Sequence, residues 1–281
     1  MQLKRRTLLS GLAASAAVPF MSAAHAKQAD ADTKWDKETD VLVIGYGGAG
    51  ACAAIEAHDN GSKVLIIEKM AQPGGNTAIS SGGFMVPQDG PTALKYLTAT
   101  YDLANSEKDD ELLNTFCKEI MGVKDWMTGL KEGTELWVYG HAGFQNLPGW
   151  EVIDKYRVRG KKRSGDCLFD LYRYAVEEKR NIPVMLETPA VQLIQKDGQV
   201  VGAVAKNNGK NINIKANKAV ILTTGGYEFD PESLRTYAQG ENYHALGNPG
   251  NTGDGLRMAQ SMGARLWHMT ACLLYTSPSP R

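Results

Sequence analysis

The chain has 281 residues, and its 31 Lys and Arg balance 31 Asp and Glu, so the formal net charge is zero. A nucleic-acid-binding protein usually carries a basic excess, so this balance argues against that class. Hydrophobic residues make up 43% of the chain and charged residues 22%, which is the composition of a globular protein rather than a disordered one.

The N-terminus has the pattern of an export signal. Three basic residues at positions 4–6 precede an apolar, alanine-rich run, and the A-H-A tripeptide at 24–26 fits a small-residue cleavage site. The paired arginines resemble the twin-arginine signal, which exports proteins already folded around their cofactors. We therefore predict an export signal of the twin-arginine type over residues 1–26, a flexible leader over 27–39, and a location in the bacterial periplasm or cell envelope.

A β-α-β unit follows the leader. Residues 40–44 are a continuous apolar run, as expected for a strand buried on both faces of a parallel sheet. A glycine-rich turn separates this strand from a helix predicted over 51–59. Residues 63–67 form a second apolar strand, which ends at Glu68.

Beyond this unit, a loop of small residues at 74–83 leads into a longer and more varied stretch. Asp197-Gly198 between two alternating segments is a strong hairpin signal. The predicted fold class is α/β, with a central parallel sheet, a helical excursion and a β-hairpin or meander insert. The remaining predicted elements are helices within 91–131, a helix over 165–179, strands over 190–195, 199–206, 211–215 and 219–222, and a helix over 253–262.

The C-terminal ten residues, 272–281, break the preceding pattern and resemble the translation of a transposase-adapter sequence. We interpret them as a non-native tail and expect the natural protein to continue past Ala271. Residues 40–271 are then an incomplete domain. We expect such a fragment to be inactive by itself.

The strongest motif is Gly45-x-Gly47-x-x-Gly50, placed between a strand and a helix, with Glu68 at the end of the next strand. The first glycine permits the tight turn, the second lets the backbone approach a pyrophosphate, and the third lets helix and strand pack closely. The helix N-terminus favours phosphate. Glu68 is suited to the hydroxyls of an adenosine ribose and repels a 2′-phosphate, which disfavours NADP.

This fingerprint does not by itself separate NAD from FAD. The loop at 74–83 carries hydroxyl and amide groups that suit a long cofactor, and an NAD-binding domain usually proceeds directly to its next strand instead. Two further glycine-containing turns, Thr223–Gly226 and Thr252–Gly255, supply more close approaches of backbone, and Asp254 is placed to bind a hydroxyl chain such as ribityl. These segments favour FAD.

The chain resembles the family of FAD-dependent oxidoreductases that contains the flavoprotein subunits of fumarate reductase and succinate dehydrogenase. The resemblance is to its soluble branch, with flavocytochrome c fumarate reductases, urocanate reductase and 3-ketosteroid dehydrogenases. It implies a Rossmann-like FAD domain interrupted by a substrate-capping domain, which is missing from this fragment. The segments that carry it are 40–57, 64–69, 74–83, 219–230 and 251–269.

The resemblance also implies which residues contact FAD. In the respiratory branch a histidine in the loop after the second strand bonds covalently to the flavin; Asn76 stands there in this chain, so we predict non-covalent FAD. The implied contacts are Gly45, Gly47, Ala49 and Gly50 at the pyrophosphate, Glu68 and Lys69 at the adenosine, Gly75, Asn76, Thr77, Ser81 and Gly82 along the diphosphate and flavin, Ala190 at the adenine, and Gly225 and Asp254 completing the site.

The implied activity is reduction, or in reverse desaturation, of a C=C bond conjugated to a carboxylate or carbonyl, with hydride transfer at flavin N5. The substrate is then a small unsaturated acid or enone. The chain has no CxxCH haem motif, so electrons come from a separate donor such as a cytochrome or a quinol-linked carrier. In this family the catalytic Arg and His belong mainly to segments beyond Ala271, so no catalytic residue is assigned.

Other candidate residues are weaker. The five His and four Cys form no HExxH or CxxC motif, so no metal site is predicted. His141 and His268 are more simply explained as packed or solvent-facing side chains. A cluster of five basic residues within 157–163 is able to attract an anionic substrate, but a solvated face explains it better.

Two alternatives remain open at this point. An FAD amine or amino-acid oxidase shares the first β-α-β unit, and oxygen-dependent peroxide formation on amines would favour it. A non-catalytic FAD-binding fragment is the other, and flavin that binds without being reduced or reoxidised would favour that.

Overall fold

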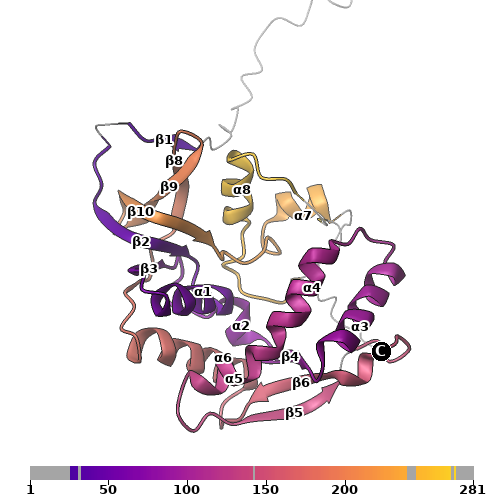
Figure 1. Ribbon diagram of the computed structural model, residues 1–281. Helices are drawn as coiled ribbons and strands as arrows, with labels where there is room; N and C mark the ends of the chain where they lie inside the picture. The colour runs from indigo at the N-terminus through magenta and orange to yellow at the C-terminus, as the bar shows by residue number, and fades with distance from the viewer. Residues whose placement is uncertain (1–25, 31–32, 142, 239–244, 267–268, 270–281) are drawn as a thin grey trace, which may run out of the picture.

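In the part of the chain that the computed structural model describes, residues 26–30, 33–141, 143–238, 245–266 and 269, a seven-stranded sheet forms the centre of the protein (Figure 1). Its strands are β1 (Lys27–Gln28), β2 (Lys37–Ile44), β3 (Val64–Ile67), β7 (Val184–Met185), β8 (Ala190–Lys196), β9 (Gln199–Asn207) and β10 (Lys210–Leu222). The order is β1-β8-β9-β10-β2-β3-β7. Strands β10, β2, β3 and β7 are parallel, whereas β8, β9 and β10 form an antiparallel meander. The predicted parallel sheet with a hairpin insert is confirmed.

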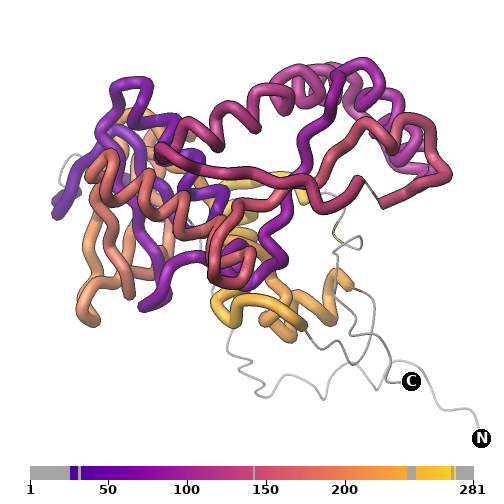
Figure 2. The backbone as a smooth tube through the Cα atoms, turned by 90° about the horizontal axis from the view of Figure 1, so that it is seen from below, coloured from indigo at the N-terminus to yellow at the C-terminus, as the bar shows by residue number. Residues whose placement is uncertain are grey.

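The excursion between β3 and β7 contains the predicted helices and also a sheet that the sequence analysis did not predict. Strands β4 (Phe84–Pro87), β6 (Ile153–Val158) and β5 (Leu136–His141) pair antiparallel in that order. Figure 2 shows the helical excursion lying to one side of the central sheet. Its helices are α2 (Gly75–Ile79), α3 (Gly90–Leu103), α4 (Asp110–Glu119), η1 (Ile120–Gly122), α5 (Val123–Gly129), η2 (Trp150–Val152), α6 (Ser164–Arg173) and the π-helical turn η3 (Tyr174–Glu178).

Three further helices complete the fold: α1 (Gly48–Asp59) between β2 and β3, and α7 (Pro231–Tyr237) and α8 (Asp254–Ser261) after β10. Helices α3 and α7 each have a proline in the first turn and an aspartate as the N-terminal cap, Asp89 in α3 and Asp230 in α7. None of the helices in the described ranges is both long enough and apolar enough to cross a membrane.

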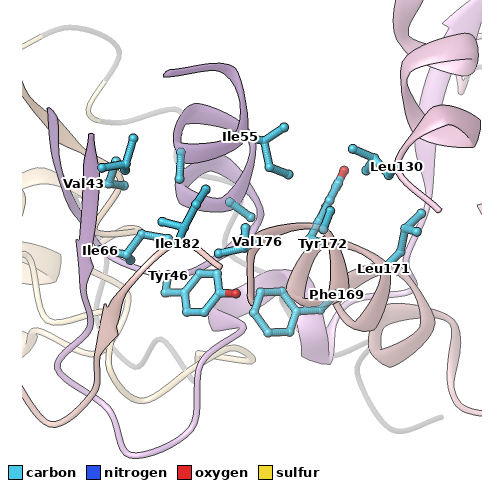
Figure 3. Close-up of a cluster of buried hydrophobic side chains, with 14 of the residues drawn as sticks. Val43, Tyr46, Ile55, Ile66, Leu130, Phe169, Leu171, Tyr172, Val176 and Ile182 are labelled. Atoms are coloured by element: carbon cyan, nitrogen blue, oxygen red, sulfur yellow. The ribbon is translucent and has the colours of Figure 1, made fainter. Parts of the chain in front are cut away.

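Both faces of the parallel strands are buried, which explains why 40–44 and 63–67 read as continuous apolar runs. On one face Val43 and Ile66 pack with α1, α6 and η3, which supply the buried side chains of Ile55, Phe169 and Val176 (Figure 3). On the other face, the strand residues pack with the meander and with Met258 of α8; this second cluster contains Leu42, Ile44, Leu65, Ile67, Leu193, Ala203, Ala205, Ile214 and Ala216.

The strands predicted separately at 211–215 and 219–222 are one strand, β10. It pairs antiparallel with β9 up to Lys215 and parallel with β2 as far as Leu222. The register with β2 shifts between Ala216 and Ala219. Two polar residues at 217–218 interrupt the apolar pattern at this shift, which is why the sequence alone suggests two strands.

The expected flexible leader at 27–39 is only partly correct, because the structure places residues at both ends of it in strands. Lys27 pairs with Ile194 of β8, and β2 starts at Lys37 instead of residue 40. The side chain of Asn213 donates to the backbone carbonyl of Lys34 at 2.7 Å. Unpaired backbone groups at the edge of the meander provide the partners for this segment, which has no apolar run of its own to predict a strand.

An ion pair between α1 and the end of η3 gives the fold a pH dependence. Arg180 donates two hydrogen bonds to Asp59, at 2.7 and 2.6 Å, and these lower the pKa of Asp59 to about 2. Because this pKa lies below that of the unfolded chain, the stabilisation is complete above about pH 4 and is lost as the pH falls towards 2.

Urea unfolding from pH 5 to pH 2 is expected to show a shallower loss of stability in Arg180→Gln than in the wild type. Arg159→Gln, which removes an exposed ion pair, is the matched control, and an unchanged slope in Arg180→Gln would contradict the assignment.

Candidate functional site

A cavity of about 310 Å³ opens at the carboxyl ends of the parallel strands. The last residues of β2, β3 and β10, namely Ile44, Ile67 and Leu222, all line it. Ligands of open α/β sheets bind at this edge. Eleven of the fourteen predicted contact residues line the cavity: Gly45, Gly47, Ala49, Glu68, Lys69, Gly75, Asn76, Thr77, Ala190, Gly225 and Asp254.

The three glycines of the turn after β2 have different structural requirements. Gly45 has φ +104°, and a Cβ on it would lie 2.4 Å from the carbonyl oxygen of Thr223. A Cβ on Gly50 would lie 2.1 Å from the carbonyl oxygen of Gly45. At Gly47 the nearest atom to such a Cβ is 3.7 Å away, on Gly74, which is ordinary contact. The protein's own packing therefore requires the first and third glycines, whereas the second keeps space open on the cavity.

Helix α1 begins at this turn with its N-terminus on the cavity. Its cap residue, Gly47, makes no side-chain capping hydrogen bond, and the first turn carries no acidic residue. The amide of Gly48 donates to Thr77 Oγ1 at 3.0 Å, and Ala49 lines the cavity beside it. The N-terminus of this 12-residue helix offers further amide donors and a partial positive charge, which suits a phosphate group.

Glu68 fixes one end of the cavity. Its side chain is 9% exposed, with Oε2 accepting from the amide of Tyr46 at 2.7 Å and Oε1 from the amide of Met70 at 2.8 Å. Each carboxylate oxygen keeps a further acceptor position. Thr188 and Ala190 line the same end, and the amide of Thr188 donates to the Glu68 carbonyl. Glu68 thus holds the glycine turn and still presents acceptors to a ligand hydroxyl.

Lys69 and Asp254 join the two sides of the cavity. Lys69 Nζ lies 2.6 Å from Asp254 Oδ2 and 2.7 Å from Thr252 Oγ1. Arg257 also donates to Asp254, at 2.8 Å. The sequence analysis expected Lys69 and Asp254 near different parts of the cofactor, and the structure brings them into one ion pair between the end of β3 and the start of α8.

Amide side chains form another part of the cavity wall. Asn76 of α2 lies there together with Asn248, Asn251 and the turn at Gly225, which has φ +72°. Behind them lies Glu228, whose Oε1 accepts from Asn76 Nδ2 at 2.7 Å and from Asn251 Nδ2 at 2.6 Å.

Three predicted contact residues do not line the cavity: Gly50, Ser81 and Gly82. Gly82 has φ +65°, and a Cβ on it would lie 2.2 Å from the carbonyl oxygen of Ser164. The structure therefore explains Gly50 and Gly82 by packing between backbone segments, and Ser81 is exposed. A glycine that permits packing cannot be distinguished in sequence from one that permits a ligand to approach.

The sequence analysis missed several residues of the cavity wall and its support. Thr188 is fully buried there, although it lies in a short loop with no motif. Asn248 and Asn251 precede the recognised turn at 252–255, and Glu228 directly follows Tyr227 in a segment that was quoted only for its glycines. Asn248, Asn251 and Glu228 share only a polar side chain within three residues of a glycine turn, which is too general a signal to select them, and Thr188 lacks even that.

The basic cluster and His141 do not line this cavity. Arg157 stacks over Tyr139 at 3.9 Å from the ring centroid, and His141 Nδ1 lies 3.1 Å from Asp154. His268 lies outside the described residues. Ion pairs join Arg159 to Glu135, Lys162 to Asp170 and Arg163 to Asp166. Among the residues that the structure describes, no three His, Cys, Asp or Glu gather as metal ligands.

The cavity residues fit an FAD molecule in chemical type. The wall contains a carboxylate with free acceptor positions and a helix N-terminus, and Gly47 leaves beside that helix a space that the protein itself does not need. These features match a ribose, a pyrophosphate and the close approach of backbone to it. The amide groups of Asn76 and Asn251 remain for the other half of the cofactor.

Comparison with known proteins gives the same assignment. The model of a protein family described as "FAD binding domain" matches residues 40–279. A fumarate reductase (cytochrome) from Shewanella frigidimarina is 31% identical over 241 residues, covering 82% of this chain and 41% of that protein. A urocanate reductase from Eggerthella lenta is 32% identical over 246 residues, covering 83% and 39%.

Among solved structures, the open conformation of a flavocytochrome c3 fumarate reductase has a TM-score of 0.72 and 28% identity, covering 82% of this chain and 41% of that one. The chain thus spans about 40% of the length of these relatives. The family match, however, extends over most of the chain. The chain therefore belongs to the FAD-binding domain family of fumarate-reductase-like, FAD-dependent oxidoreductases.

Proposed function

We propose that the protein is an exported oxidoreductase that reduces, or in reverse desaturates, a C=C bond conjugated to a carboxylate or carbonyl. The observation that carries this is the match to reductases whose names specify such substrates, fumarate and urocanate. The cavity supports it, because its wall supplies the anion-binding helix N-terminus and the ribose-binding carboxylate that FAD needs.

Bound FAD supplies the hydride that the reaction needs. The described residues bind and orient it: the start of α1 holds the pyrophosphate, Glu68 and Lys69 the adenosine, and Ala190 the adenine. Asn76 has an amide and no nucleophilic atom, which supports non-covalent attachment. The proposed contacts that line the cavity are Gly45, Gly47, Ala49, Glu68, Lys69, Gly75, Asn76, Thr77, Ala190, Gly225 and Asp254. Gly50, Ser81 and Gly82, the other three expected contacts, lie outside its lining.

The remaining parts of the proposal concern what lies around this domain. Charge builds up on the substrate's carboxylate or carbonyl in the transition state, so the complete enzyme needs cations and a proton donor beside it. A separate electron donor, such as a cytochrome or a quinol-linked carrier, and export through the signal at 1–26 complete the proposal.

The test uses the full-length protein from the source gene, reconstituted with FAD and reduced anaerobically with dithionite. Fumarate, urocanate, acrylate and an α,β-unsaturated ketone are added separately, and flavin reoxidation at about 450 nm is followed. At least one is expected to reoxidise the flavin rapidly, with one alkene consumed per two electrons. Failure of every conjugated alkene, together with rapid peroxide formation from amines in air, would replace the proposal with an amine oxidase.

A further inference from the structure

A carboxylate that does not line the cavity holds together the residues at one end of it. Glu228 follows the TGGY turn after β10, and its Oε1 accepts from the side-chain amides of both Asn76, at 2.7 Å, and Asn251, at 2.6 Å. Both asparagines line the cavity and Glu228 does not. One oxygen atom of Glu228 therefore connects α2 with the loop that precedes α8.

A second set of hydrogen bonds closes this arrangement. Asn76 Oδ1 accepts from the amide of Asn248 at 2.7 Å, and the amide of Asn251 donates to the carbonyl of Asn248 at 3.0 Å. The amide of Phe229 donates to the carbonyl of Asn251, also at 3.0 Å. We call Asn76, Asn248 and Asn251, gathered around Glu228, the amide clasp. It joins three segments that are far apart in the sequence.

The clasp has little freedom to rearrange. Asn251 is 6% exposed, and a Cβ on Gly225 would lie 2.3 Å from its Oδ1, so the side chain packs directly on the glycine backbone. A Cβ on Gly226 would lie 2.3 Å from Glu228 Oε2, so the carboxylate occupies the space beside that glycine. The two glycines of the turn thus make room for the clasp, which explains them without a ligand.

The clasp residues Asn76 and Asn251 line the part of the cavity wall that we assign to the flavin half of the cofactor. Glu68 suits the ribose, and the start of α1 suits the pyrophosphate. A dinucleotide that places these two groups there leaves the wall at Asn76 and Asn251 for its remaining half.

We propose that Glu228 is a positioning residue for the flavin. It orients the amides of Asn76 and Asn251 before FAD binds, because hydrogen bonds to an ionised acceptor are stronger than those between neutral groups. Its negative charge also opposes the negative charge that the flavin gains when it takes up two electrons and one proton, which lowers the flavin midpoint potential. The inference depends on FAD binding and on neither the substrate nor the direction proposed above.

The test compares Glu228→Gln with Glu232→Gln in the full-length flavoprotein. Glu232 is exposed and four residues away, so its variant removes the same charge without touching the clasp. Three quantities are measured: the FAD dissociation constant of the apoprotein, the midpoint potential by anaerobic dithionite titration with a reference dye, and the melting temperature of the apoprotein.

Glu228→Gln is expected to weaken FAD binding about tenfold, the difference between charged and neutral hydrogen bonds to two amides. Its midpoint potential is expected to become more positive, while Glu232→Gln keeps both wild-type values. Wild-type affinity and potential in Glu228→Gln would overturn the proposal. A lower melting temperature with unchanged FAD affinity and midpoint potential would show that Glu228 only stabilises the fold, and this result would also overturn the proposal. Substrate turnover enters none of these readouts, so a failed alkene assay does not affect the outcome.

Discussion

Replacing Gly47 by alanine is expected to weaken FAD binding about 10- to 100-fold, the effect of one extra methyl group in a filled contact, while the protein stays folded. The backbone at Gly47 has φ −92° and ψ −166°, which alanine adopts without strain. The nearest atom to the new methyl group is 3.7 Å away. The methyl group therefore meets no protein atom closely and projects into the space where the cofactor backbone approaches. The measurements are an FAD titration of the apoprotein and its thermal melt.

Gly50→Ala is the matched control, because it adds the same methyl group to the same turn with the opposite consequence. The new Cβ would lie 2.1 Å from the Gly45 carbonyl oxygen and 2.8 Å from Thr223 Oγ1. Neither backbone segment is able to move without separating α1 from the sheet, so we expect a loss of about 3 kcal/mol or more in the free energy of unfolding. If Gly47→Ala lowered the melting temperature as much as Gly50→Ala, the distinction between the two glycines would be wrong.

Glu68→Ala is expected to damage both stability and cofactor binding. The substitution leaves the amides of Tyr46 and Met70 without their acceptor in a buried position, which costs about 2–4 kcal/mol in the free energy of unfolding. It also removes the acceptor for the adenosine ribose, so FAD affinity is expected to fall about 10- to 100-fold. Urea unfolding and FAD titration measure the two effects separately.

Glu178→Ala, which truncates an exposed glutamate on η3, is the control for Glu68→Ala and is expected to change neither quantity. Glu68→Gln adds a finer test. It keeps one acceptor oxygen but turns an amide NH₂ towards a backbone N–H group, so intermediate stability is expected. A Glu68→Ala protein with wild-type FAD affinity would show that the carboxylate supports the turn alone.

The sequence is sufficient for the parts of the fold that depend on local pattern. The apolar runs at 40–44 and 63–67, the glycine turn between strand and helix, and Asp197-Gly198 each specify their element within a few residues, and the structure agrees with all of them. The same locality explains why eleven of the fourteen predicted contacts lie on one cavity: they belong to turns at the ends of strands that the fold brings to one edge.

Pairing between distant short segments was not predictable in this way. Strand β4 has only four residues, and its partner β6 lies beyond three α-helices, two short 3-10 helices and strand β5, so nothing local connects Val86 with Asp154. The clasp was missed for the same reason, because Asn76 and Glu228 are 152 residues apart and no local pattern indicates that they meet. Strand β1 in the leader was not predicted, because it forms only by pairing with the edge of β8.

The cavity can form only after β10 has been synthesised. Ile44, at the end of β2, pairs with Leu222, and the Thr223 side chain that follows donates to the carbonyls of Ile44 and Gly45. During synthesis the first β-α-β unit therefore has an open edge until the ribosome has passed β10, and contacts over so large a sequence separation form slowly. Nascent chains that end before residue 222 should expose this apolar edge to chaperones, and cofactor capture becomes possible only near the end of the domain's synthesis.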